Sequence, residues 1–286
     1  MPSGIDSVQK ASSPALGVLK KKPSTGNINP SSLKLERIIG STVNNLHSFQ
    51  LHPSLLSSIS RPAGLPPMVN LASDGNNSMF SELAAYVAGT IVVLYNIKKN
   101  KQIKFLEHPA SNKPFSCLAF SRDGQYLAAG EKGHKPTIIV WDLHKVLETA
   151  TSEEEKPRIC FELKSKDKGH QQEVKDICFS KDGKMLISVG FENELKIWEL
   201  IPGSSAVSSN TIGKGELKFS KSVDPTNAIM LSPCDDTGFI TAGSGFVRFW
   251  SYSKTQKTSL LSVRSMACNL DCWGKSNFVS LASRGK

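Results

Sequence analysis

Long hydrophobic runs are absent from this 286-residue sequence, and none approaches the roughly 20 residues that a membrane-spanning helix needs. A secretory signal is also absent, because the lysines Lys20 to Lys22 follow the weakly apolar N-terminal segment instead of preceding it. We therefore expect a protein of the cytosol or nucleus that does not associate with a membrane.

Cysteine is scarce, with six residues and no pair in the C-x-x-C spacing. Cys268 and Cys272 lie near each other, but their spacing is not that of a zinc knuckle. We interpret the cysteines as buried thiols that serve as small apolar side chains. The sequence predicts no metal site.

A catalytic constellation is also missing. The six histidines are scattered, and none accompanies a serine or cysteine in a nucleophile-elbow motif. The stretch Gly274 to Ser276 resembles the end of a phosphate-binding loop, but Asn269 occupies the position where that loop needs its first glycine. We therefore predict no catalytic residue, no nucleotide or other cofactor, and no enzymatic activity.

What the sequence does contain is a repeat. The stretch 115–143 indicates three short strands, with an Arg-Asp-Gly turn after the first strand and Trp141-Asp142 near the end of the third. The stretch 174–200 repeats the Phe-Ser-x-Asp-Gly turn and ends in Trp198-Glu199. A third version, 227–252, ends around Trp250. Such repetition predicts a modular architecture built of similar units.

The domain boundaries follow from composition and from these repeats. Residues 1–32 are rich in Ser, Pro, Asn and Lys, so we expect a disordered basic tail. Residues 33–286 then form the repeat domain, with units expected at 33–106, 115–163, 174–220 and 227–263 and a partial fifth unit at 266–286.

Four strands in each unit, with Trp-Asp or Trp-Glu closing the third strand, resemble the WD40 β-propeller family. The resemblance implies an all-β fold in which each unit is one blade and loops at the ends of the blades bind partners. About four to five blades would make an incomplete propeller with open sheet edges. We expect either a fragment of a longer protein or a chain that needs a partner for closure.

In that family a hydrogen-bonded network of His, Ser or Thr, Asp and Trp stiffens each blade. The resemblance implies three network positions in the third unit, with Glu192 in place of the aspartate, and it aligns Ala128 with the serine of the second unit. The structural positions it implies are Trp141, Asp142, His170, Ser188, Trp198, Thr241 and Trp250.

Three further stretches, 33–40, 85–101 and 129–136, resemble the mitogen-activated protein kinase-binding WD-repeat subfamily, which includes a spindle-pole member. This closer resemblance implies a non-catalytic scaffold in kinase signalling or in centrosome and spindle organisation. It also implies protein partners such as Jun N-terminal kinase or spindle-pole proteins, and a location in the cytoplasm or at the spindle pole.

Two short motifs have competing interpretations. The basic and apolar string 98–105 fits a kinase-docking motif, but its alternation fits a β-hairpin better. Ser13, followed by proline in the expected tail, is a candidate phosphorylation site.

The net charge of +10 leaves an alternative function open, namely a basic WD40 module that binds RNA or a ribonucleoprotein. Part of that charge lies in the expected tail, so we favour protein partners over nucleic acid. A second alternative, an enzyme with its site in propeller loops, would need convergent acids that the sequence does not show.

Overall fold

The computed structural model describes residues 37–38, 41, 48–51, 53, 82–148, 159–164, 168–203, 212–232, 237–254 and 261–267. The chain forms two compact units, 1–40 and 41–286, and the fold below belongs to the second. The expected tail, Ser13, the Gly274 to Ser276 stretch, Cys268 and Cys272 all lie outside the described residues. No helix among the described residues is long and apolar enough to cross a membrane.

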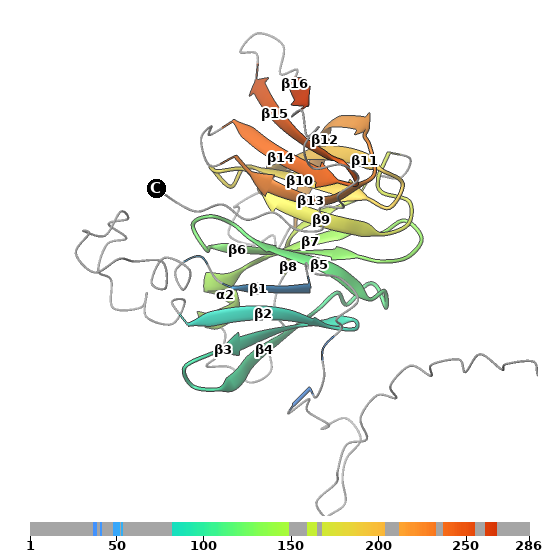
Figure 1. Cartoon of the computed structure of the whole chain (residues 1–286). Helices are drawn as coiled ribbons and strands as arrows, with labels where there is room; N and C mark the ends of the chain where they lie inside the picture. The colour runs from blue at the N-terminus through green and yellow to red at the C-terminus, as the bar shows by residue number, and fades with distance from the viewer. Residues whose placement is uncertain are drawn as a thin grey trace, which may run out of the picture. The chain divides into compact units, whose positions relative to one another are not determined.

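Three sheets make up the described fold, as Figure 1 shows. The first contains β1 (Phe49–Leu51), β2 (Leu83–Ala88), β3 (Ile91–Asn96) and β4 (Lys101–Glu107). The second contains β5 (Phe115–Phe120), β6 (Tyr126–Glu131), β7 (Ile138–Asp142), β8 (Ile159–Leu163), β9 (Val174–Phe179), β10 (Met185–Gly190), β11 (Glu194–Ile201) and β12 (Gly213–Ser222). The third contains β13 (Thr226–Leu231), β14 (Gly238–Gly243), β15 (Phe246–Lys254) and β16 (Leu261–Ala267).

The strands form four consecutive groups of four antiparallel strands, which we call blades one to four. The first strands of successive blades, β1, β5, β9 and β13, lie next to one another in chain order. An apolar core separates each blade from the next, and Trp141, Trp198 and Trp250 each contribute to a different core. This arrangement confirms the predicted all-β, propeller-type fold.

The Phe-Ser-x-Asp-Gly turn has the same structure in blades two and three. Ser121 donates its hydroxyl to Asp123 at 2.5 Å and accepts the amide of Tyr126 at 2.8 Å. Ser180 does the same with Asp182 and Met185, at 2.6 and 2.9 Å. The glycine that follows each aspartate has a positive φ, +74° at Gly124 and +68° at Gly183. The turn residues thus determine where each first strand ends.

Blades two and three are not separate sheets, which the sequence analysis did not predict. Strand β12 pairs in parallel with β8 at Gly213↔Phe161 and Lys214↔Glu162, so the two blades form one eight-stranded sheet. A Cβ atom at Gly213 would collide with Phe161, and one at Gly215 would collide with Leu163. The two glycines therefore permit this close approach.

Three elements differ from the expected positions. Within the unit expected at 33–106 the first strand is β1, and the described Arg37 and Ile38 are not in a strand. A short helix, α2 (Leu143–Glu148), follows Trp141-Asp142. Met266, assigned above to a fifth unit, belongs to β16 of blade four.

Candidate functional site

The expected network of blade three is complete in the structure. Trp198 donates its indole N–H to Ser188 Oγ at 2.9 Å, and Ser188 Oγ lies 2.7 Å from His170 Nε2. His170 Nδ1 makes a hydrogen bond with Glu192, which occupies the place of the expected aspartate. His170, Ser188 and Trp198 are no more than 2% exposed.

One tautomer of the histidine is consistent with all three hydrogen bonds, while Oε2 of Glu192 is buried without a hydrogen-bond partner. Nδ1–H donates to the Glu192 carboxylate, Nε2 accepts the Ser188 hydroxyl proton, and Ser188 Oγ accepts the tryptophan N–H. Burial lowers the pKa of His170, although Glu192 opposes that shift. Burial also acts to raise the pKa of Glu192, but its hydrogen bond to His170, the charge of His170 and backbone hydrogen bonds together hold that pKa below its usual value. The imidazole is therefore neutral at neutral pH.

Blades two and four hold their tryptophans differently. Trp250 donates to Thr241 Oγ1 at 2.8 Å, whereas the indole nitrogen of Trp141 is buried and has no hydrogen-bond partner. Leu127 pairs with Trp141 as Leu186 pairs with Trp198, so the residue of blade two that matches Ser188 is Ala129. The alignment of Ala128 with that serine was therefore wrong by one position, on the opposite side of the strand.

Blade two instead contains a buried pair that the sequence analysis missed. Glu131, which is fully buried, lies 2.7 Å from His108 Nδ1 and accepts the amide of Thr137 at 2.9 Å. Burial acts to raise the pKa of Glu131, but its hydrogen bonds with His108, Thr137 and Ser111 and the charge of His108 together lower that pKa. The signal in the sequence was an apolar strand, YLAAG, that ends in a glutamate.

Asp142 acts at the start of α2, where it accepts the amide of His144 at 3.1 Å. The other six predicted positions are each at most 3% exposed. Their side chains offer almost no surface to a partner. They hold the sheets whose loops form the surface.

The thiols of the described residues are unsuited to nucleophilic catalysis. Burial raises the pKa of Cys160 to about 11 and raises the pKa values of Cys117 and Cys178 well above the ordinary range. Across the described ranges there is also no group of three potential metal ligands.

One end of the blades forms what we call the loop face, made of the β2–β3, β6–β7, β10–β11 and β14–β15 loops and the segments that enter β5, β9 and β13. Backbone bonds join these loops to one another, both within a blade and between blades two and three. Gly133 donates to the carbonyl of Gln172 at 2.6 Å, and Phe191 donates to that of Glu173 at 2.8 Å. The loop face is therefore held rigidly by the sheets.

Phe191 is the exposed aromatic of the loop face, with 54% of its surface accessible. Lys175 Nζ lies 5.2 Å from the centre of its ring and 3.4 Å from Asn193 Oδ1. Burial lowers the pKa of Lys175. Beside it, Lys132 and Glu173 form an ion pair at 3.2 Å. An apolar ring surrounded by charges is the usual composition of a protein-binding surface.

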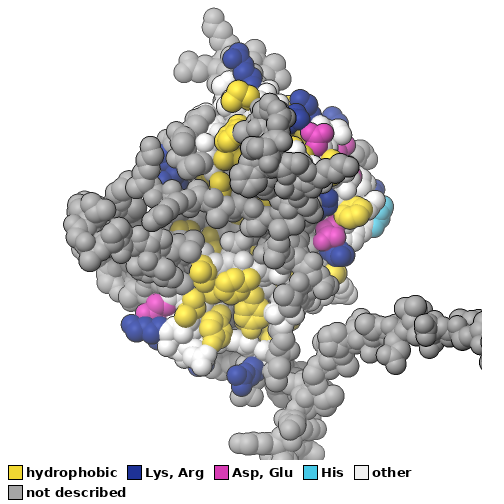
Figure 2. All heavy atoms as spheres, viewed as in Figure 1, with side chains coloured by type: hydrophobic (Ala, Val, Ile, Leu, Met, Phe, Trp, Pro, Cys, Tyr) yellow, Lys and Arg dark blue, Asp and Glu magenta, His cyan; other side chains and the backbone are white. Residues whose placement is uncertain are grey.

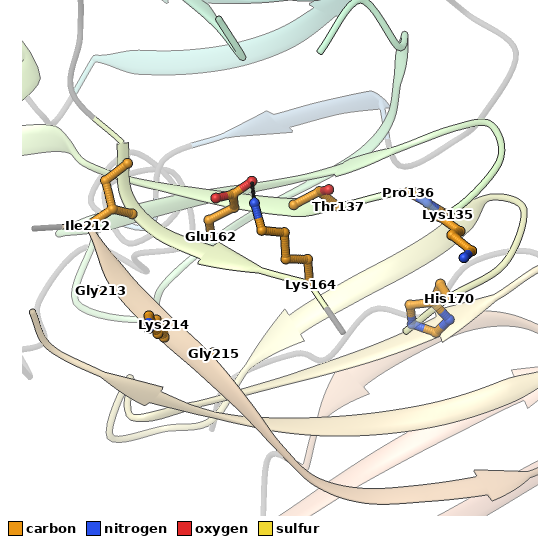
Figure 3. Close-up of a pocket in the computed structure, with 10 residues that line it drawn as sticks. All are labelled: Lys135, Pro136, Thr137, Glu162, Lys164, His170, Ile212, Gly213, Lys214 and Gly215. Carbon is orange, nitrogen blue, oxygen red and sulfur yellow. Dashed lines mark hydrogen bonds and ion pairs between the residues drawn. The ribbon is translucent and has the colours of Figure 1, made fainter. Parts of the chain in front are cut away.

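A second surface feature lies between the outer strands of blades two and three. A cavity of about 580 Å³ is lined by Lys135, Pro136, Thr137, Glu162, Lys164, His170, Ile212, Gly213, Lys214 and Gly215. An adjoining cavity of about 520 Å³ is lined by His108, Ala110, Ser111, Asn112, Lys113, Thr137, Glu162 and Lys164. Figure 3 shows the ion pair of Glu162 with Lys164 on β8, opposite the glycines of β12.

A third feature is an apolar row on blade one. The pairing of β1 to β4 aligns Phe49, Tyr86, Val93 and Phe105 across the sheet, and Phe49 is 53% exposed. Figure 2 shows hydrophobic side chains gathered over this sheet.

Comparison with known proteins identifies the repeats. Residues 100–142 and 161–199 match the model of the WD domain, G-beta repeat. The chain is 46% identical to mitogen-activated protein kinase-binding protein 1 of Mus musculus over 76 residues, and this alignment covers 27% of this chain and 5% of that protein. Over 66 residues it is 44% identical to WD repeat-containing protein 62 of Mus musculus, covering 23% of this chain and 4% of that protein.

A longer match, 26% identical over 170 residues, is to cilia- and flagella-associated protein 52 of Mus musculus and covers 58% of this chain and 23% of that protein. The crystal structure of Kluyvelomyces marxianus Hsv2 aligns with 66% of this chain and 56% of its own, at 12% identity and a TM-score of 0.45. The chain carries WD40 repeats, and the resemblance to the kinase-binding subfamily is confirmed over partial stretches. The aligned part spans less than a quarter of these curated relatives' length.

Proposed function

We propose that this chain is a non-catalytic scaffold that binds a partner protein on its loop face, around Phe191. The observation that carries the proposal is the exposed ring of Phe191, 54% accessible, fixed by its backbone bond to Glu173 and by Lys175 beside its ring. Aromatic side chains in a rigid setting are the usual anchors of protein interfaces. Because the surface is already ordered, a partner would bind without an ordering cost in this chain.

The finer proposal concerns the partner. The names of two relatives mention mitogen-activated protein kinase binding and cilia and flagella. We propose a mitogen-activated protein kinase, with Jun N-terminal kinase as the first candidate, and a site of action at the cytoskeleton, including the spindle pole. The strand string 98–105 is an unsuitable kinase-docking motif, because it spans the β3–β4 turn and β4, where its backbone is already paired.

The experiment compares Phe191→Ala with Ile97→Ala in binding to purified Jun N-terminal kinase by biolayer interferometry. Ile97 is 41% exposed and lies in the β3–β4 turn, at the opposite end of the blades, so it is a matched control. Loss of an anchor side chain weakens an interface by about 2 kcal/mol, or roughly 30-fold in Kd. We expect that loss for Phe191→Ala and less than about two-fold for Ile97→Ala.

Two results would contradict this proposal in different ways. If wild type and Phe191→Ala bound the kinase equally well, the partner would have to bind at a surface other than the loop face. No binding to Jun N-terminal kinase or to related mitogen-activated protein kinases would refute the partner class.

A further inference from the structure

We propose that the two adjoining cavities between blades two and three form one groove that binds an extended acidic peptide segment of a partner protein. We call this the inter-blade groove. It is distinct from the surface around Phe191, and no residue of that surface lines it. The inter-blade groove would let the scaffold hold a second partner.

The shape of the groove follows from the short contact between β8 and β12. The two strands pair only at Gly213↔Phe161 and Lys214↔Glu162, and one cavity lies along β12 beyond that contact. The second cavity continues from Thr137, Glu162 and Lys164, which line both, toward His108 and Lys113. Two joined cavities of about 580 and 520 Å³ suit an elongated occupant better than a compact small molecule.

The charge of the groove selects an acidic occupant. Lys113, Lys135, Lys164 and Lys214 line it, against a single carboxylate, that of Glu162. That carboxylate is paired with Lys164 at 2.8 Å, and Lys113 is paired with the buried carboxylate of Glu131 at 3.7 Å. Carboxylates of a bound peptide would therefore meet chiefly Lys135 and Lys214.

The wall on the β12 side adds an apolar contact. Ile212 is 46% exposed at the end of the groove. Gly213 and Gly215 beside it line the cavity with backbone, while Phe161 and Leu163 fill the space where their side chains would lie. A peptide with leucine or isoleucine next to its acidic residues would cover Ile212, so we propose a mixed acidic and aliphatic segment.

Nucleic acid is the less suitable occupant. Single strands bind proteins chiefly by stacking bases on aromatic side chains. No Phe, Tyr or Trp lines either cavity in the described part of the chain. The lysines alone would attract phosphates without specificity.

The probe is a fluorescein-labelled peptide of Asp and Glu with interspersed Leu, followed by fluorescence anisotropy on the whole chain. The test variant is Lys135→Glu with Lys164→Glu and Lys214→Glu. The control is Lys98→Glu with Lys99→Glu and Lys101→Glu, three exposed lysines on blade one that give the same change in charge. We expect roughly a ten-fold or greater loss of affinity for the test variant and less than about two-fold for the control.

Three further arms sharpen the test. An analogue with Asn and Gln in place of the acids should not bind. Ile212→Ala should weaken binding of the Leu-containing peptide but not of an all-acidic one. This variant replaces the triple variant as the test if the triple variant fails to fold. Phe191→Ala should bind the peptide normally, which separates this proposal from the loop-face proposal.

Equal losses in the two triple variants would show diffuse attraction to a basic protein and would overturn the proposal. Equal binding of the uncharged analogue would also overturn it. The same conclusion follows if a single-stranded oligonucleotide displaces the peptide at a lower concentration than unlabelled peptide does.

Discussion

Ser188→Ala is the sharpest test of the network in blade three. In the folded chain the serine hydroxyl contacts two buried groups at once, the indole N–H of Trp198 at 2.9 Å and His170 Nε2 at 2.7 Å. Removing one oxygen therefore leaves a buried donor and a buried acceptor without partners, at a position where Ser188 is fully buried.

The magnitude follows from the number of groups left unpaired. Each buried polar group that loses its partner costs about 1–3 kcal/mol, so Ser188→Ala should destabilise the fold by about 2–6 kcal/mol. Thr241→Ala leaves only the Trp250 indole unpaired and should cost about 1–3 kcal/mol. Against a total stability of roughly 5–15 kcal/mol for a typical domain, both losses are measurable.

The assay is urea unfolding followed by tryptophan fluorescence and circular dichroism. Ala129→Ser is the complementary variant, because its new hydroxyl would lie where Trp141 lacks a partner, and it should stabilise the fold by up to about 1 kcal/mol. The reasoning would be refuted if Ser188→Ala destabilised the fold by less than about 0.5 kcal/mol, because two unpaired buried groups should cost more than that. It would also be refuted if Thr241→Ala destabilised the fold more than Ser188→Ala, because it leaves fewer groups unpaired.

Two further predictions concern pH and the joined sheet. Because burial lowers the pKa of His170, the unfolded chain binds its proton first, so stability should fall as pH drops below about 6.5, by up to about 1.4 kcal/mol per unit. Glu192 and Glu131 have lowered pKa values, so their contributions to stability are lost only at more acid pH. If His170→Gln lost stability between pH 7 and 5 as steeply as the wild type, the titration of His170 would not be the cause. Gly215→Val should destabilise the fold by about 1–3 kcal/mol and speed amide exchange in β8, because the valine side chain would collide with Leu163. The control, Lys214→Val, should change neither the stability nor the exchange.

Much of the fold was predictable because its signals are local. The Ser-x-Asp-Gly turns satisfy their own hydrogen bonds within a few residues, so blades two and three could be located without knowledge of their neighbours. The strand β1 could not be predicted, since its three residues become a strand only by pairing with β2.

The network shows the same division. Trp141, Trp198 and Trp250 could be identified from their spacing in the sequence. Which residue of β6 lies beside the Trp141 indole depends on strand register, and a shift of one position exchanges Ala128 for Ala129. The pair of His108 with Glu131 was also hidden, because 23 positions separate the two side chains.

The sequence by itself determined an all-β repeat fold and the tryptophans that fill its three cores, because alternation, turn chemistry and repetition act over short distances. Only the tertiary structure decided the rest: the exposed Phe191 beside Lys175, the buried His108 and Glu131, and the contact of β8 with β12 that forms the inter-blade groove. These features join residues that lie far apart along the chain, and only the pairing of strands and the packing of the sheets bring them together.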